Sequence, residues 1–94
     1  EIITEETQGL TGLEIFPNPS DGEQFNLKLQ GLENKEVLVV VRDLKGAEYY
    51  AKVIVVKSDN QIEVIDPEKH LAPGIYLVTG SSENILYSKK LIVK

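Results

Sequence analysis

The residues of this chain that could take part in catalysis are few and do not form a recognisable constellation. His70 is the only histidine and there is no cysteine, so a nucleophilic triad would depend on His70 alone and a thiolate is excluded. Carboxylates are common, but Glu14, Glu36, Glu48 and Glu63 fall in or beside strand patterns and are interpreted as a solvated face. Nothing in their spacing indicates a glycosidase pair. The sequence predicts no catalytic residues and a protein that is not an enzyme.

The dipeptide Asp21-Gly22 invites comparison with a calcium-binding loop, but the residues before it do not fit. An EF-hand loop needs oxygen ligands at alternate positions before its glycine, and here those positions hold Pro17, Pro19 and Asp21. The glycines that could cradle a phosphate stand apart from one another, at Gly22, Gly46 and Gly74. We therefore expect no metal and no cofactor.

The stretch Phe16-Pro17-Asn18-Pro19-Ser20-Asp21-Gly22 is predicted to be a rigid turn. Its prolines fix their own φ angles and push Phe16 and Asn18 toward extended conformations. Gly22 offers a position where φ can be positive. Such a segment fits neither a helix nor a central strand, so we expect it to end one strand and direct the next.

Composition places the chain among globular domains and suggests a boundary near its start. The 94 residues are enough for one domain, and the net charge of −5 argues against a nucleic-acid partner. No apolar run approaches the roughly 20 residues of a membrane span, so no membrane insertion is expected.

Residues 1–12 are acidic and contain two glycines, which predicts a flexible leader or linker before a domain at 13–94. A first edge strand using Ile2 and Ile3 is the alternative. The start resembles neither a signal peptide nor a natural N-terminus, so we expect a piece of a longer protein.

Alternating apolar and polar residues mark short strands along the rest of the chain. The clearest covers residues 24–30, where Phe25, Leu27 and Leu29 share one face. Residues 36–43 are apolar on both faces, which is typical of a central strand. Further strands are expected at 13–16, 48–56, 61–65, 74–79 and 85–93. This pattern predicts an all-β fold, an immunoglobulin-like antiparallel β-sandwich of about seven strands.

Three local signals refine this fold. Asp43-Leu44-Lys45-Gly46 has Asp and Gly at the outer positions of a four-residue turn, which predicts a hairpin over 36–56. Asp66-Pro67-Glu68 resembles a helix start, with room for a single turn before Pro73. Tyr76 is either the tyrosine corner of an immunoglobulin-like fold, whose hydroxyl bonds a backbone group upstream, or an ordinary boundary residue.

Four stretches, taken in order, resemble one known family. They are Phe16–Gly22, Val41-Arg42-Asp43-Leu44-Lys45-Gly46, Leu71-Ala72-Pro73-Gly74-Ile75-Tyr76-Leu77-Val78 and Ser88-Lys89-Lys90-Leu91-Ile92-Val93-Lys94. Together they are similar to the C-terminal sorting domain (type A) of cargo proteins of the type IX secretion system. The resemblance covers residues 13–94, although residues 47–70 carry no motif of the family.

The resemblance implies a function outside catalysis. Such domains are seven-stranded immunoglobulin-like sandwiches at the C-termini of exported proteins of Bacteroidetes-group bacteria. The type IX machinery reads them and moves the cargo, which precedes the domain on the same chain, from the periplasm across the outer membrane. A sortase-like protease at the surface then usually removes the domain, and the cargo is secreted or attached to anionic lipopolysaccharide. By this reading the cut falls in or before residues 1–12.

The resemblance also suggests which residues the machinery reads. We expect the surface near the Asn18 turn and the segment Lys89–Lys94 to be recognised. The prolines and glycines of the turns are interpreted as shaping the sandwich; they are Pro17, Pro19, Gly22, Gly46 and Gly74. The candidate motif residues are Pro17, Asn18, Pro19, Ser20, Gly22, Asp43, Gly46, Pro73, Gly74, Tyr76, Lys89, Lys90, Leu91 and Lys94. The alternative is that the lysines have no role in recognition and only make the domain more soluble.

A second function class is left open by the sequence. An immunoglobulin-like sandwich can also be a binding or adhesion module appended to a secreted enzyme. Its contact residues would be exposed aromatics, for which Tyr49, Tyr50 and Tyr87 are the candidates. Weak self-association is open as well. Removal of the domain from the mature protein would favour sorting, and its retention would favour binding.

Overall fold

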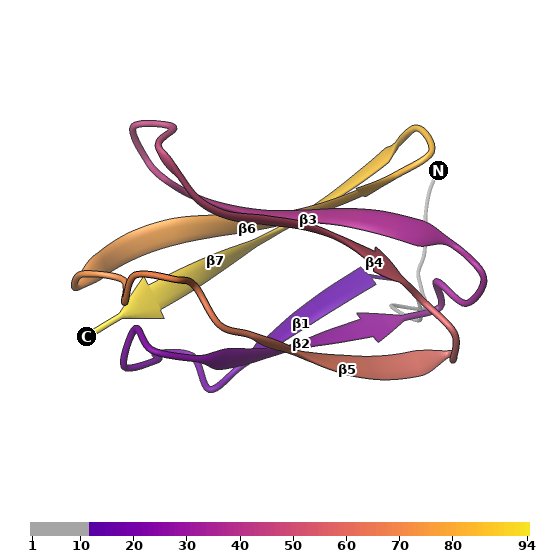
Figure 1. The fold of residues 1–94 in the computed structure, drawn as a ribbon, viewed down its shortest axis with the longest axis horizontal. Coiled ribbons are helices and arrows are strands. Elements are labelled where there is room, and N and C mark those ends of the chain that lie inside the picture. Colours follow the sequence, from indigo (N-terminus) through magenta and orange to yellow (C-terminus); the bar gives the residue numbers. More distant parts are fainter. Residues whose placement is uncertain (1–11) are drawn as a thin grey trace, which may run out of the picture.

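The computed structural model describes residues 12–94 and shows two antiparallel sheets packed face to face (Figure 1). The strands are β1 (Gly12–Phe16), β2 (Phe25–Gln30), β3 (Glu36–Asp43), β4 (Glu48–Val55), β5 (Asn60–Ile65), β6 (Gly74–Ser82) and β7 (Ile85–Val93). The predicted all-β sandwich of seven strands is confirmed. The predicted leader lies outside the described residues except for Gly12, which is the first residue of β1. Residues 12–94 contain no helix that is long and apolar enough to span a membrane.

The helical turn predicted after Asp66 was wrong. The segment from Asp66 to Pro73 is an irregular connection between β5 and β6. Pro67 is fully buried, and the backbone N–H of Leu71 donates to the carbonyl of Gly22 at 2.8 Å. The donor that could have continued a helix is thus used in a long-range contact, and tertiary packing overrides the local capping signal.

The fourth strand decides which kind of sandwich this is. One sheet has the order β1-β2-β5 and the other β4-β3-β6-β7. In constant-type immunoglobulin domains the fourth strand joins the sheet of the first, second and fifth. Here it pairs with β3, from Glu36 opposite Val55 to Arg42 opposite Glu48. β3 is therefore flanked by β4 and β6, which confirms it as a central strand.

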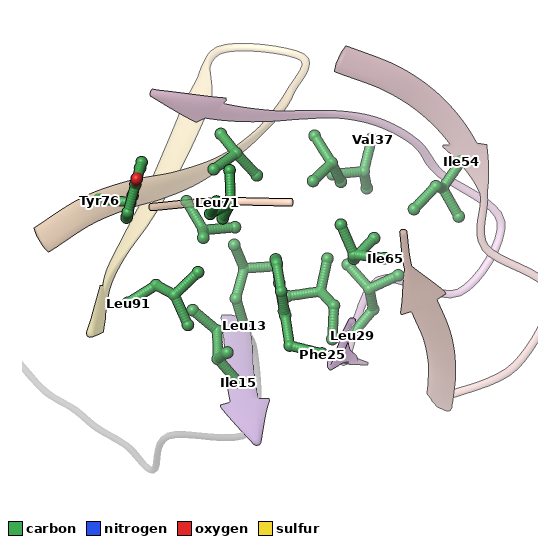
Figure 2. Packing of buried hydrophobic residues seen from close by; sticks show 14 of the residues in the cluster. Leu13, Ile15, Phe25, Leu29, Val37, Ile54, Ile65, Leu71, Tyr76 and Leu91 are labelled. Carbon is green, nitrogen blue, oxygen red and sulfur yellow. The ribbon is translucent and has the colours of Figure 1, made fainter. Parts of the chain in front are cut away.

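Alternation along the strands sends one apolar face of each sheet into a shared core. In β2 the side chains of Phe25, Leu27 and Leu29 are buried while those between them are half-buried. In β3 the inward residues are Val37, Val39 and Val41. Figure 2 shows members of this cluster from both sheets meeting between the layers. Burial of apolar surface, worth about 1.5–3 kcal/mol per large side chain, holds the two sheets together.

Tyr76 forms the tyrosine corner that the sequence left open. Its hydroxyl donates to the carbonyl oxygen of Ala72 at 2.6 Å, while its ring is 5% exposed. The ring of Tyr49 stands edge-on to it, with centroids 5.5 Å apart and planes at 85°. The corner ties the start of β6 to the connection that precedes it, at one end of the core.

Replacing Tyr76 by Phe tests this contact. Tyr76→Phe keeps the ring but leaves the Ala72 carbonyl without its donor, so the free energy of unfolding should fall by about 1 kcal/mol. Urea denaturation measures the change. Tyr50→Phe is the control, because the Tyr50 hydroxyl makes no hydrogen bond to another described residue and its loss should change little. Equal effects of the two substitutions would contradict the corner.

Candidate functional site

Residues 17–22 carry the chain from one sheet to the other. β1 belongs to the three-stranded sheet, but Ser20, four residues after β1 ends, pairs in parallel with Val93 of β7 in the four-stranded sheet. The backbone N–H of Ser20 donates to the carbonyl of Ile92 at 2.8 Å, and the N–H of Lys94 donates to the carbonyl of Ser20 at 3.1 Å. The predicted turn is therefore also an edge partner of the C-terminal strand.

The side chain of Asn18 extends this pairing. Its Oδ1 accepts the N–H of Ile92 at 2.9 Å and its Nδ2 donates to the carbonyl of Lys90 at 2.8 Å. One amide group thus satisfies two backbone groups of β7 in the way a neighbouring strand would. Pro17 and Pro19, each following a cis peptide bond, have no N–H that would need a partner at this exposed edge. Asn18 and Ser20 together cover the edge of β7 from Lys90 to Lys94.

The end of the stretch is fixed by contacts of its own. Ser20 is 4% exposed, and its hydroxyl oxygen accepts the N–H of Gly22 at 3.0 Å. Oδ1 of Asp21 accepts the N–H of Glu23 at 2.9 Å. Gly22 has a φ of +88°, as expected, and a Cβ atom there would collide with the carbonyl oxygen of Leu71. Gly22 is needed both for its conformation and for this close approach.

The predicted turn at Asp43 is confirmed, and its carboxylate is the centre of a network. The N–H of Gly46 donates to the Asp43 carbonyl at 3.1 Å. Oδ1 of Asp43 accepts the N–H groups of Lys45 and Ala47, both at 2.9 Å, and Oδ2 accepts the Tyr49 hydroxyl at 3.0 Å. These hydrogen bonds lower the pKa of Asp43, and the bond from the Ala47 N–H has the largest effect. The same carboxylate raises the pKa of Tyr49 through their hydrogen bond.

The four family-like stretches meet at one end of the sandwich, here called the motif end. Gly22 contacts Leu71, Gly74 pairs with Val93, and Asp43 pairs with Tyr76. In Figure 1 the C-terminus, the β1–β2 turn, the β5–β6 connection and the β3–β4 turn lie at this end, on the left. In the sequence these four stretches are far apart, and only the fold shows that they contact one another.

Burial separates the candidate residues into two groups. Leu91 is fully buried, Tyr76 and Ser20 are nearly so, and Gly22 is buried as well; their part is packing and shape. Asp43 is half-buried, and the exposed candidates are Pro17, Asn18, Pro19, Gly46, Pro73, Gly74, Lys89, Lys90 and Lys94. Among residues 12–94 no carboxylate lies within 4.0 Å of any of the last three, so the lysines present charge to solvent.

Two aspects of the site escaped the sequence. The pairing of Asn18 with β7 joins residues 74 positions apart, and no local pattern announces it. Tyr49 is a candidate for an exposed binding aromatic by sequence, but its hydroxyl and its ring are engaged by Asp43 and Tyr76. Tyr50 and Tyr87 pack against the core. Tyr49 and Tyr50 line one hollow, with Glu48, Ala51, Asp66 and Glu68, whereas Tyr87 lines another, beside Gly12.

The groups that could have suggested catalysis remain apart. His70 is exposed, and no cluster of three or more potential metal ligands occurs among residues 12–94. Glu14, Glu36 and Glu48 are exposed and Glu63 is half-buried. Glu48 lies 3.9 Å from Arg42 in an exposed ion pair.

Most of the chain matches the model of a known protein family. A family model described as "Secretion system C-terminal sorting domain" matches residues 14–94. No curated protein and no solved structure matches the chain significantly. The match covers all seven strands except the first two residues of β1.

Gly22 and Gly46 have similar φ angles, but only Gly22 lies close to the Leu71 carbonyl, so alanine at each position tests that contact. Gly22→Ala should lower the free energy of unfolding by roughly 3 kcal/mol, because a positive φ and a backbone collision act together. Gly46→Ala, at a φ of +93° where an added Cβ would meet no atom within 4 Å, should cost only about 1 kcal/mol. Chemical denaturation gives both values. Equal losses would contradict the contact with Leu71.

The Asp43 network predicts a pH dependence. Because the pKa of Asp43 is lower in the folded state, its contribution to stability is present above its unfolded pKa and is lost as pH falls through the folded value. The difference in unfolding free energy between the wild type and Asp43→Asn should therefore shrink between about pH 5 and pH 2. Tyr49→Phe, which removes one donor, should reproduce part of this change. A difference that stays constant with pH would contradict the network.

Proposed function

Because this chain belongs to the family of secretion system C-terminal sorting domains of type IX secretion, we propose that it carries a cargo domain on the same chain across the outer membrane. The cargo passes from the periplasm to the cell surface. A sortase-like surface protease then removes the domain by cutting within or before residues 1–12. The domain itself acts as a folded label.

The observation that carries this proposal is the convergence at the motif end. Asn18 and Ser20 lock the last residues of the chain, β7 pairs with β6, and β6 pairs with β3. A partner that recognises a folded label needs groups held in fixed relative positions, since ordering them on binding would weaken the complex. The hydrogen bonds at this end supply that rigidity.

Charge gives this end its recognisable chemistry. Lys89, Lys90 and Lys94 are exposed and make no ion pair among the described residues. Asn18, between the exposed Pro17 and Pro19, bonds to the Lys90 carbonyl, whereas Lys89 lies in the middle of β7 and lines a hollow with Gly12. We assign recognition to these six residues, with the lysines attracting an acidic surface of the machinery. The remaining candidates, namely Ser20, Gly22, Asp43, Gly46, Pro73, Gly74, Tyr76 and Leu91, hold the shape.

Attachment of the cargo is compatible with this arrangement. The chain enters the fold at Gly12, whose neighbour across the sandwich is the ring of Tyr87. Phe16, at the other end of β1, leads into the motif end. The four residue steps of β1 separate the two points by about 14 Å. Cargo joined before Gly12 thus enters the fold away from Asn18, although Gly12 lines the same hollow as Lys89.

Export of a reporter tests the assignment. A reporter with a signal peptide, fused to residues 1–94 in a bacterium with type IX secretion, should reach the surface or medium. Replacing Lys89, Lys90 and Lys94 by Gln should leave most of it in the periplasm, because the charge is lost while Leu91 and Val93 stay in the core. Removing residues 89–94 would be less informative, since it deletes both core residues.

A matched control changes the same charge elsewhere. Lys28, Lys52 and Lys57 replaced by Gln should permit normal export, and thermal unfolding should show that both triple variants fold. Equal export of the two variants would contradict a role for the C-terminal lysines. Mass spectrometry of the exported wild-type reporter should find its C-terminus at or before residue 12. An exported reporter that keeps the whole domain would favour the binding module.

A further inference from the structure

The outer face of the four-stranded sheet is unusually apolar for a surface open to solvent. Seven aliphatic side chains on it are 37–67% exposed: Leu38, Val53, Val55, Ile75, Leu77, Leu86 and Ile92. The outer face of the three-stranded sheet is mixed: Phe16, Ile62 and Val64 are exposed there, among the polar residues Glu14, Asn26, Lys28, Gln30 and Asn60. An antiparallel sheet with one solvated face is expected to be polar there. An apolar face of this kind marks an interaction site.

The strand register arranges this face in rows. Residues paired across neighbouring strands share a row, and each row runs from β4 through β3 and β6 to β7. The first row is Val53, Leu38, Ser81 and Leu86. The second is Ala51, Val40, Thr79 and Ser88, and the third is Glu48, Arg42, Leu77 and Lys90. The first row thus has a large aliphatic residue at each edge, and the second has small residues. The third has Glu48 at one edge, where it pairs with Arg42 of the same chain, and Lys90 at the other.

We propose that in the free domain this face is covered by a second copy of the same chain, and that the two copies separate when the machinery binds Lys90. A two-fold axis that runs along the strands, between β3 and β6, lays β4 of each copy over β7 of the other. Leu86 then faces the second copy's Val53, and Lys90 faces the second copy's Glu48. Each of these contacts occurs twice, as an isologous interface requires.

The rows favour this axis over the other two-fold arrangement of the same faces. An axis perpendicular to the strands would lay β7 over β7 and exchange the first row with the third. Leu86 would then face Lys90, and Val53 would face Glu48, so charges would be buried against aliphatic side chains at a cost. With the axis along the strands, the small second row allows close approach. The long side chain of Lys90 spans the offset that arises when twisted sheets pack at about −30°.

The oligomeric state of the 94-residue chain tests the proposal and does not depend on export. Sedimentation equilibrium should show a reversible dimer. Leu86→Asp, which places a charge opposite Val53, should give a monomer. Val64→Asp is the matched control, because Val64 is 58% exposed on the outer face of the other sheet, and it should still dimerise. A wild type that stays monomeric at millimolar concentration would overturn the proposal.

Charge reversal tests the orientation. Lys90→Glu and Glu48→Lys should each weaken the dimer by about tenfold, because like charges then face each other. The double variant should recover most of the affinity, the remainder being lost because Lys at position 48 stands beside Arg42 of its own copy. Circular dichroism identifies any variant that fails to fold. Failure of a folded double variant to recover would contradict this axis.

Cross-linking gives a second test that tolerates weak association. The chain contains no cysteine, so only introduced thiols react with a short bis-maleimide. A mixture of Leu86→Cys and Val53→Cys should yield linked heterodimers, and neither variant alone should link efficiently. Equal linking of Leu86→Cys with itself would show another arrangement and overturn the proposal.

Discussion

The structure depends on how the last strand is held at its outer edge. β7 places Leu91 and Val93 in the core, yet only β6 pairs with it along its length. An edge strand exposes a row of unpaired backbone groups that invites pairing with other chains. Asn18, through its side-chain amide, and Ser20, through its backbone, supply the missing partners from Lys90 to Lys94. A crossover early in the chain thus closes the sandwich around its C-terminus.

This closure explains why the family-like stretches matter together. Gly22 lets the crossover approach Leu71, the tyrosine corner fixes the start of β6, and Asp43 fixes the hairpin whose Tyr49 packs on Tyr76. Because Asn18 bonds to Lys90 and Ile92, this end of the fold can form only once residues 90–92 have been synthesised. The motif end therefore joins segments that are far apart in the described part of the chain.

Local patterns in the sequence were sufficient for the elements and the fold class. Period-two alternation located the strands, the apolar residues on both faces of residues 36–43 identified a central strand, and Asp43 with Gly46 identified a turn. The hairpin predicted over 36–56 is confirmed by the pairing of β3 with β4. The pairing of β2 with β5 and of Asn18 with β7 was beyond reach, because it depends on contacts distant in sequence. The helix start at Asp66 failed for the same reason, since Gly22 takes the N–H of Leu71. Gly22 and Gly46 look alike in sequence, and only packing distinguishes them.

Hydrogen exchange at the backbone amide of Ile92 tests the central claim most directly. In the wild type this N–H donates to Oδ1 of Asn18. Asn18→Ala should accelerate its exchange by about tenfold or more, since loss of about 1.4 kcal/mol corresponds to a factor of ten. The core amides of β3 should change little, and Asn26→Ala, on the outer face of β2, should leave Ile92 protected. Unchanged exchange at Ile92 in Asn18→Ala would contradict the account.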